Sequence, residues 1–554
     1  MRLNQLIAVV WLSLAACGGT PVPVDSSGPA IGTQGMVSTA HPIATEAGLS
    51  ILRNGGNAFD AAVTIAATLN VVEPMMSGIG GYGTILLYDA ESLETHYLDA
   101  SGKIPMAVDS DIYRPPTPDY KENRRNAKAV STPGAANAWE AMSKRFGELA
   151  WPLLLEPAIH AAEEGFEIDE RTAFFIERAF PEFPEHAREF YGQDGAPLKE
   201  GDRLIQKDLA ASLRQLADEG ASAIYGGSLG KAIDVAMQEA GGFLAFEDLL
   251  NDRAEWWEPI SITYRGYEVI TPSAPAGAFP MLVRLGIMSL EDNRELGHNT
   301  VEYLHRFAEV TKHAYWTRLA YSGDPDVKPP PYDVLLSKSY WEAQSSEIDP
   351  DSATQFDASD IVAAQTSDTT THFVVADQWG NIVSATVTLG NLFGSRIMAE
   401  GTGIWLNNSL AYCTFEPKGN PMDAHPGRRK LSSDSPSLVL RDGRPWVAVG
   451  TPGGHTITQT VAQIIMNIVD FDMNIQEAIA APRIAFNVPN HLDVEDRVPE
   501  EIRNALAAKG HEIRIRNLGN AHGLTIEYDE SGKPVRFTGG ADPRGTGLAE
   551  GYCR

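Results

Sequence analysis

Three consecutive threonines, Thr369 to Thr371, stand directly before the strand-like sequence HFVVAD. A threonine hydroxyl is a weak nucleophile unless a base lies beside it, and the α-amine of an N-terminal threonine can be that base. The usual pKa of such an amine is about 8, so much of it is neutral near pH 7. A chain that cut itself before one of these threonines would create nucleophile and base in one step. Threonine runs in strands are more often structural, so both interpretations stay open on the run alone.

Two glycine-containing motifs suggest other chemistry but lie in unsuitable contexts. Residues 78–83, GIGGYG, match a dinucleotide-binding pattern that should follow a strand and open a helix. Here a predicted helix precedes the motif and a predicted strand follows it. Residues 226–230, GGSLG, match a nucleophile elbow, which needs a buried strand before it, whereas the preceding residues have helical, polar character. No His or Cys spacing indicates a metal site. We therefore expect no cofactor and no metal.

Several separate motifs resemble the γ-glutamyltransferase family, also called γ-glutamyltranspeptidases or glutathione hydrolases, within the N-terminal nucleophile (Ntn) hydrolase superfamily. The similarity runs from about Gly35 to Gly551, with the motifs in the same order. They are ILRNGGNAFDAAVTIA, GIGGYG, TTHFVVADQWGN, LSSDSPSLVL, TPGGH and GGADPRGTGLAEG. The resemblance implies an α/β (α+β) fold, a four-layer αββα sandwich of the Ntn-hydrolase type. Large and small subunits would form it jointly after self-cleavage.

The resemblance assigns the cut to the bond between Thr369 and Thr370. Cleavage there would give a large subunit, residues 31–369, and a small catalytic subunit, residues 370–554, which stay together as a heterodimer. Thr370 would be the catalytic nucleophile. Thr388, in the following strand, would hydrogen-bond the new amine and hold it for proton transfer.

Two further pairs of residues receive roles from the same resemblance. Gly453 and Gly454 would offer backbone N–H groups to the tetrahedral oxyanion, where close approach without a side chain is needed. The alternative for this pair is a simple turn after WVAVGTP. Ser432 and Ser433 match the pair that binds the carboxylate end of the substrate.

Three departures from the family pattern concern substrate recognition. Ser101 occupies the position of an Arg that usually holds the α-carboxylate of a γ-glutamyl group, and Tyr412 that of an Asp that holds its α-amine. Gly390 replaces an Asn, with Asn391 next to it. Ser101, Tyr412 and Asn391 therefore become candidate substrate-binding residues with altered chemistry. Losing a charge-assisted partner in a buried site costs a few kcal/mol, enough to change the preferred substrate.

Lys103 and Arg429 are the basic residues that could supply replacement charge. Lysine is a poor substitute for the planar arginine fork. We expect a solvated surface role for each of them.

These observations predict an amidohydrolase and acyltransferase. It would cleave γ-glutamyl or related side-chain amides through an acyl-enzyme and pass the acyl group to water or an amine. Because the usual glutamyl partners are missing, a cephalosporin-acylase-like or dicarboxylic-monoamide amidase is the first alternative. A non-catalytic surface lipoprotein that keeps the fold as a binding module is the second.

Charge and targeting signals restrict partners and location. Lys and Arg total 44 against 73 Asp and Glu, a formal charge of -29, which disfavours nucleic acid and anionic lipid. Residues 1–17 resemble a lipoprotein signal whose Cys17 is lipidated, and residues 18–30 form a flexible tether. The apolar run is too short to span a bilayer. We expect a periplasmic or cell-envelope protein that meets the membrane only through its lipid anchor; an ordinary secretory signal is the alternative.

The remaining expectations concern local structure. Pro42 to Arg53 and the apolar stretch after Asn57 should be consecutive helices. More helices should follow from about Ala135 to Leu250, and consecutive antiparallel strands from Asp368 onward. Cys413 and Cys553 could form a disulfide or remain free, and the Pro- and Gly-rich residues 418–430 are the candidate lid.

Overall fold

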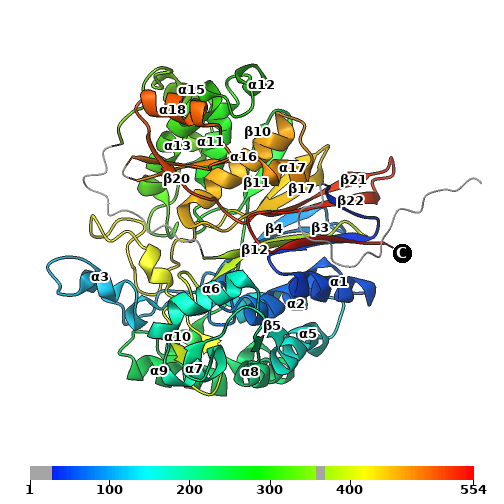
Figure 1. Cartoon of the computed structure of the whole chain (residues 1–554), viewed down its shortest axis with the longest axis vertical. Coiled ribbons are helices and arrows are strands. Elements are labelled where there is room, and N and C mark those ends of the chain that lie inside the picture. Colours follow the sequence, from blue (N-terminus) through cyan, green and yellow to red (C-terminus); the bar gives the residue numbers. More distant parts are fainter. Residues whose placement is uncertain (1–27, 357–368, 489, 554) are drawn as a thin grey trace, which may run out of the picture.

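Two large antiparallel sheets lie face to face, and helices cover both outer faces (Figure 1). The structure is a computed structural model that describes residues 28–356, 369–488 and 490–553. The lipobox, Cys17, the tether up to residue 27 and Asp368 lie outside the described residues. The predicted combination of helices and sheets is confirmed.

The first sheet has seven strands, of which the central four come from the chain after Thr370. In spatial order they are β1 (Ala30–Gly32), β22 (Pro534–Ala541), β21 (His522–Tyr528), β17 (Arg444–Gly450), β16 (Ser437–Arg441), β11 (Tyr267–Thr271) and β10 (Ile260–Tyr264).

The second sheet also has seven strands and mixes the two parts of the chain more closely. Its order is β23 (Leu548–Tyr552), β2 (Gly35–Thr39), β12 (Thr371–Asp377), β13 (Ile382–Thr388), β3 (Tyr82–Asp89), β4 (Glu94–Asp99) and β9 (Glu255–Trp257). Strand β2 therefore pairs on both sides with strands that follow Thr370 in the sequence. A cut before Thr370 would leave these ladders intact.

Helices cover the outer face of each sheet. Those on the second sheet include α1 (Pro42–Arg53), α2 (Ala58–Val72), α4 (Ala135–Phe146), α5 (Trp151–Glu164), α6 (Glu170–Ala179), α7 (Glu185–Tyr191), α8 (Lys207–Glu219), α9 (Ser228–Glu239) and α10 (Phe246–Asn251). Those on the first sheet include α11 (Phe279–Met288), α13 (Val301–Tyr321), α15 (Lys338–Ser346), α16 (Ile457–Val469), α17 (Ile475–Ala480) and α18 (Glu500–Ala508). Strands β18 (Ile484–Asn487), β19 (His491–Val494) and β20 (Glu512–Ile515) form a small separate sheet.

Each large sheet has an apolar core under its helices, and a third apolar core lies between the two sheets. The residues of this third core show which way the strand side chains point. Successive side chains of a strand face opposite sides. Val374 and Ala376 of β12 belong to the core between the sheets, whereas Phe373 and Val375 pack toward α1 and α2. By the same alternation, His372 and the residue two before it face the opposite sheet.

The start of the chain shows how local sequence fixes the first two helices. Gly55 has φ +91°, a left-handed conformation that ends α1 at little cost. Asn57 then caps α2: its Oδ1 accepts from the N–H of Asp60 at 3.0 Å, and its own N–H donates to Asp60 Oδ2 at 3.1 Å. Every residue of α2 is buried. Both predicted helices are confirmed.

The expectation of simply consecutive strands after Asp368 is only partly correct. Strands β12 and β13 do form a hairpin, but β13 then pairs with β3, and the chain crosses to the other sheet for β16 and β17. In the segment GIWLNN only Ile404–Trp405 forms a strand, β15, which pairs with β14 (Met398–Ala399) outside both large sheets. Local alternation does not reveal which distant strand becomes the neighbour.

The two glycine motifs have structural explanations. Residues 78–81 lie between α2 and β3, which begins at Tyr82, and a Cβ on Gly80 would lie 2.0 Å from the carbonyl oxygen of Trp405. Residues 226–230 include the start of α9 and follow a 3-10 helix, Gly220–Ala223. In the described residues this helix, and not a strand, precedes the motif. The absence of a strand before either motif agrees with the sequence-based rejection of both.

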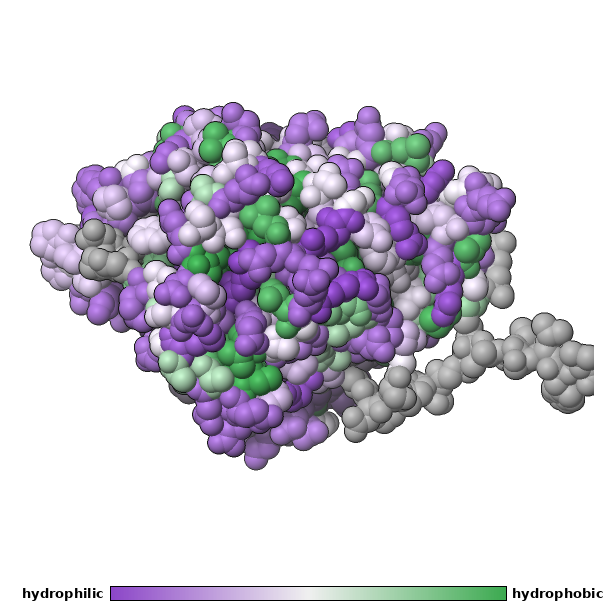
Figure 2. Space-filling view, turned by 90° about the horizontal axis from the view of Figure 1, so that it is seen from above, coloured by the Kyte–Doolittle hydropathy of each residue, from purple (hydrophilic) through white to green (hydrophobic). Residues whose placement is uncertain are grey.

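The cysteines and the surface complete the description. Cys413 is a free thiol, so the possible disulfide between Cys413 and Cys553 is not formed. The thiol is buried, and burial raises its pKa to about 12. Within the described ranges, no helix is both long and apolar enough to cross a membrane. Figure 2 shows mostly hydrophilic residues on the face seen from above, with hydrophobic residues scattered among them.

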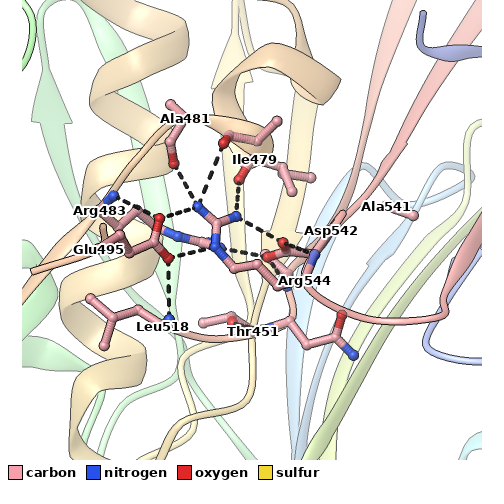
Figure 3. A network of polar contacts seen from close by, with 12 residues as sticks. Thr451, Ile479, Ala481, Arg483, Glu495, Leu518, Ala541, Asp542 and Arg544 are labelled. Atoms are coloured by element: carbon pink, nitrogen blue, oxygen red, sulfur yellow. Dashed lines mark hydrogen bonds and ion pairs between the residues drawn. The ribbon is translucent and has the colours of Figure 1, made fainter. Parts of the chain in front are cut away.

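A buried charge network holds the end of β22 against the helical layer (Figure 3). Arg483 and Asp542 are both fully buried, with Nη2 2.6 Å from Oδ2. Arg544 contacts Asp542 at 2.8 Å and Glu495 at 2.5 Å. Asp542 also accepts from the N–H of Ala521 at 2.8 Å. The closing motif GGADPRG therefore has a structural role that its sequence alone did not indicate.

We predict that Arg483→Met destabilises the protein by about 3 kcal/mol, because Asp542 would keep its buried charge with one partner fewer. Urea unfolding followed by tryptophan fluorescence measures the change. The control is Arg536→Met, which removes a half-exposed pair with Glu527 at 3.7 Å and should cost less than about 1 kcal/mol. Equal stability of the two variants would contradict a stabilising role for the network.

Candidate active site

Thr370 lies directly before β12, on the side that faces the opposite sheet. It is buried, and its Oγ1 lies 3.1 Å from Oγ1 of Thr388 at the end of β13. The register explains this contact: Thr371 pairs with Val387, so the next position outward brings Thr370 opposite Thr388. The structure thus brings together the predicted nucleophile and its predicted partner.

The predicted cleavage bond, between Thr369 and Thr370, is flanked by hydrogen bonds. Thr370 Oγ1 hydrogen-bonds the carbonyl oxygen of Thr369, the carbonyl that self-cleavage would attack. Thr369 Oγ1 donates to the carbonyl of Gly390 at 2.5 Å, and the N–H of Gly390 donates to Thr388 Oγ1 at 2.9 Å. Both threonines that flank the bond are therefore fixed against the segment that leaves β13.

Two buried neighbours of the threonine run were not recognised from sequence. Thr371 Oγ1 donates to Glu73 Oε2 at 2.8 Å, and burial raises the pKa of that carboxyl. His372 Nδ1 lies 2.9 Å from Thr386 Oγ1, and burial lowers the pKa of the imidazole well below its usual value. Both residues hold β12 in place. Because the imidazole of His372 is hydrogen-bonded and its pKa is lowered, it is better suited to packing than to proton transfer. Glu73 is 298 residues from Thr371 in the sequence, so no local pattern could have paired it with the run.

Gly453 and Gly454 occupy a turn that suits backbone donation. Gly453 has φ +135° and Gly454 has φ +59°, and both precede α16, whose N-terminal end is electropositive. Within the described residues, neither N–H has a hydrogen-bond acceptor. Gly450, at the end of β17, packs directly against His372, since a Cβ there would lie 2.2 Å from the ring. The turn therefore begins beside the first residues of β12, as the oxyanion prediction requires.

Two pockets lie beside Phe175 of α6. One, of about 290 Å³, is lined by Gly453 and Thr456. The other, of about 920 Å³, is lined by Thr369 and Asn391. The glycine turn and Thr369 thus line two pockets that both reach Phe175 of α6. Sequence periodicity identified α6 as a helix but did not place it over the site.

Ser101 lies in a buried charge cluster instead of an open subsite. Its Oγ donates to Asp99 Oδ2 at 2.8 Å, and its own N–H donates to Asp99 Oδ1 at 3.0 Å. Arg429 lies 3.6 Å from Asp99, 3.7 Å from Asp252 and 2.8 Å from Glu255. Burial raises the pKa of Asp252 to about 6 despite this arginine.

The expected surface role of Arg429 is therefore wrong, because its side chain is 3 % exposed and surrounded by three carboxylates. Lys103 does lie near the surface, 42 % exposed and 3.5 Å from Glu255. Neither side chain offers an unpaired charge to a substrate.

Tyr412 and Asn391 contact each other. Tyr412 Oη donates to Asn391 Oδ1 at 2.8 Å, and the N–H of Asn391 donates to Asn408 Oδ1 at 2.7 Å. A Cβ on Gly390 would lie 2.3 Å from Asn408 Oδ1, so a larger residue cannot enter without displacing that amide. A neutral phenol and amide therefore stand at the place where an acidic residue was expected from the family pattern.

Ser432 and Ser433 contact different partners. Ser432 Oγ donates to Asp434 Oδ2 at 2.5 Å, and Thr84 Oγ1 lies 3.4 Å from Ser432 Oγ. Ser433 Oγ accepts from Arg318 Nη2 at 3.3 Å. Burial raises the pKa of Asp434 to about 6.

The candidate lid, residues 418–430, is anchored at several points. Asp423 is buried within it and pairs with Arg114 at 2.9 Å. Its last residues, Arg429 and Lys430, are buried too. A lid function stays a prediction.

One group of possible metal ligands was missed because its members are far apart in the sequence. Ligand atoms of His305, Glu309 and His511 lie within 4.8 Å of one another. Each is already engaged: His305 contacts His511 at 2.8 Å, and Glu309 accepts from Lys312 at 2.7 Å and from the N–H of Thr354 at 3.0 Å. A lysine ammonium bound to the carboxylate favours a structural role.

Comparison with known proteins agrees with this geometry. The profile of the gamma-glutamyltranspeptidase family matches residues 44–552. The glutathione hydrolase proenzyme of Bacillus subtilis (strain 168) is 33% identical over 548 residues, covering 94% of this chain and 92% of that protein. The Acylase ACY 1 proenzyme of Pseudomonas sp. (strain SE83) is 36% identical over 553 residues, covering 94% and 98%. The crystal structure of cephalosporin acylase from Bacillus halodurans superposes with TM-score 0.85 at 28% identity, covering 97% and 99%.

The chain therefore belongs to the γ-glutamyltranspeptidase family of self-processing enzymes. Its relatives include both glutathione hydrolases and acylases, so family membership alone leaves the substrate open.

We predict that Thr388→Val slows self-cleavage at least about tenfold, because valine keeps the shape but removes the hydroxyl that contacts Thr370 Oγ1. A gel time course of freshly purified protein measures the rate. Thr538→Val, the same change at a buried position of β22, is the control and should cut at the wild-type rate. Equal rates in the two variants would exclude an orienting role for Thr388.

Proposed function

We propose that this protein cuts itself between Thr369 and Thr370 and then works as an amidohydrolase and acyltransferase with Thr370 as its N-terminal nucleophile. The observation that carries the proposal is the position of Thr370 Oγ1, which contacts both the carbonyl oxygen of Thr369 and the hydroxyl of Thr388. Residues 31–369 and 370–554 would remain one heterodimer in a four-layer αββα sandwich of the Ntn-hydrolase type.

The proposed reaction has two acyl transfers on the same hydroxyl. During maturation, Thr370 Oγ1 attacks the Thr369 carbonyl, the peptide nitrogen becomes the free amine of Thr370, and water releases the resulting ester. During turnover, that amine takes the proton from Oγ1 as the hydroxyl attacks a substrate amide. The N–H groups of Gly453 and Gly454 stabilise the oxyanion. Water or a second amine then accepts the acyl group.

The altered pocket favours a dicarboxylic monoamide over a γ-glutamyl amide as acyl donor. Tyr412 offers a neutral hydroxyl, already bonded to Asn391, where an α-amine would need an anion. A glutaryl group lacks that amine and needs no such partner. The similarity to an acylase and to a cephalosporin acylase supports this choice, and the similarity to glutathione hydrolases keeps γ-glutamyl amides as the second candidate.

We also propose that the protein works in the periplasm or cell envelope, held by lipid on Cys17. The lipobox-like Leu14–Cys17 and the following Gly- and Pro-containing residues support this location. A binding module without catalysis is disfavoured by the intact contact between Thr370 and Thr388.

We predict that purified wild-type protein separates on a denaturing gel into two fragments, one of which begins at residue 370 by mass spectrometry. Thr370→Ala should stay whole, because it lacks the attacking hydroxyl. Thr370→Ser, which keeps a hydroxyl, should still cut and is the matched control. Cutting by the alanine variant would rule out Thr370 as the nucleophile.

We predict that the mature protein hydrolyses glutaryl p-nitroanilide with a kcat/KM about ten- to a hundredfold above that for γ-glutamyl p-nitroanilide, since the unpaired α-amine costs about 1.5–3 kcal/mol. Initial rates at 405 nm, about the absorption of the released aniline, measure both. The Tyr412→Asp variant should shift the preference toward the γ-glutamyl donor. If the wild-type protein prefers the γ-glutamyl donor, other residues of the pocket must bind the α-amine in place of the missing Asp.

A further inference from the structure

Lys430 is a buried lysine whose ammonium has no carboxylate beside it. Its side chain is 2 % exposed, and Nζ lies 3.3 Å from the centre of the Tyr82 ring. One N–H donates to the carbonyl of Leu431 at 3.3 Å. Among the residues that the structure describes, no carboxylate oxygen lies within 4.0 Å of Nζ. The ring and one carbonyl are modest compensation for a charge removed from water.

The charge nevertheless persists near neutral pH. Burial lowers the pKa of Lys430 to about 8, while Asp434 and Asp99 act in the opposite direction from beyond ion-pair distance. The ammonium is therefore the main form at pH 7. A buried cation without an ion-pair partner is unfavourable, so a carboxylate arriving from solution would gain a strong, charge-assisted contact there.

Lys430 is separated from the nucleophile by only two side chains. Tyr82 stands opposite Thr388 in the pairing of β3 with β13, and Thr388 Oγ1 lies 3.1 Å from Thr370 Oγ1. Tyr82 and Thr84 share one face of β3, and Thr84 contacts Ser432. Lys430 therefore lies over the same polar face that carries the nucleophile.

Two other basic residues near this face, Arg429 and Lys103, are already paired with carboxylates, whereas Arg318 donates to Ser433 Oγ at 3.3 Å. Arg429 is surrounded by three carboxylates, and Lys103 is near the surface beside Glu255. Of Arg429, Lys103 and Lys430, only Lys430 has no carboxylate within ion-pair distance in the part of the chain that the structure describes.

We propose that Lys430 binds the free carboxylate of the acyl donor, at the end of the acyl chain away from the amide that Thr370 attacks. The inference rests on the proposed function, because it takes Thr370 as the nucleophile. It specifies the donors as monoamides of short dicarboxylic acids. A γ-glutamyl group carries the same carboxylate. The contact with Lys430 therefore favours donors that have this carboxylate, but it does not discriminate against donors that also have the α-amine.

Three p-nitroanilides test the proposal: glutaryl, γ-glutamyl, and pentanoyl, which has the length of glutaryl without its carboxylate. In Lys430→Met, the ratio of kcat/KM for glutaryl to that for pentanoyl should fall about ten- to a hundredfold. Lys103→Met, which removes a lysine from the same region, is the matched control and should keep the wild-type ratio within about twofold. Self-cleavage on a gel is checked first for every variant.

An unchanged ratio in a self-cleaved Lys430→Met protein would overturn the proposal and leave the proposed function standing. A second measurement needs no variant: glutarate should inhibit wild-type hydrolysis of the pentanoyl anilide at least about tenfold more strongly than pentanamide. Equal inhibition by the two compounds would contradict the lysine contact even if Lys430→Met does not fold.

Failure of the proposed function gives a different result. A wild-type chain that hydrolyses none of the three anilides would contradict the amidase. Calorimetric binding of glutarate, compared between wild type and Lys430→Met, then decides the role of the lysine alone: tighter binding by the wild type supports it, and equal binding refutes it.

Discussion

The register between β12 and β13 is the constraint on which the candidate site depends. It places His372 opposite Thr386 and brings Thr370 to Thr388 at the end of the ladder. A slip of one residue would turn the threonine hydroxyl toward the helices and an apolar side chain toward the opposite sheet. Apolar side chains on both faces of β12 make such a slip costly, so hydrophobic packing fixes the position of the proposed nucleophile.

Local sequence predicted what local interactions determine. The boundaries of α1 and the capping of α2 follow from Gly55, Asn57 and Asp60, which act within a few residues of one another. The nucleophile required the resemblance of several spaced motifs, because a threonine run is common in structural strands. Strand order and the position of α6 over the site depend on contacts between distant segments, which no local pattern contains.

The predictions about charge failed for a similar reason. Arg429 belongs to a polar, lysine- and arginine-rich segment, and such segments usually lie in water. Its burial depends on Asp99, Asp252 and Glu255, which arrive from distant parts of the chain. Ser101 and Arg429 together contact Asp99, so a buried charge cluster occupies the region where the family pattern has an arginine.

Strand β2 pairs on both sides with strands that come after Thr370, and this interleaving has a consequence for the order of events in the life of the protein. Chain termini normally lie at the surface, because a charged amine is hard to enclose during folding. If the chain is cut before Thr370, as proposed, the sheet forms around an uncut peptide bond and the new terminus is made afterwards, inside the folded structure. On this proposal folding would precede the chemistry, and detection of the cut would indicate that both sheets have assembled.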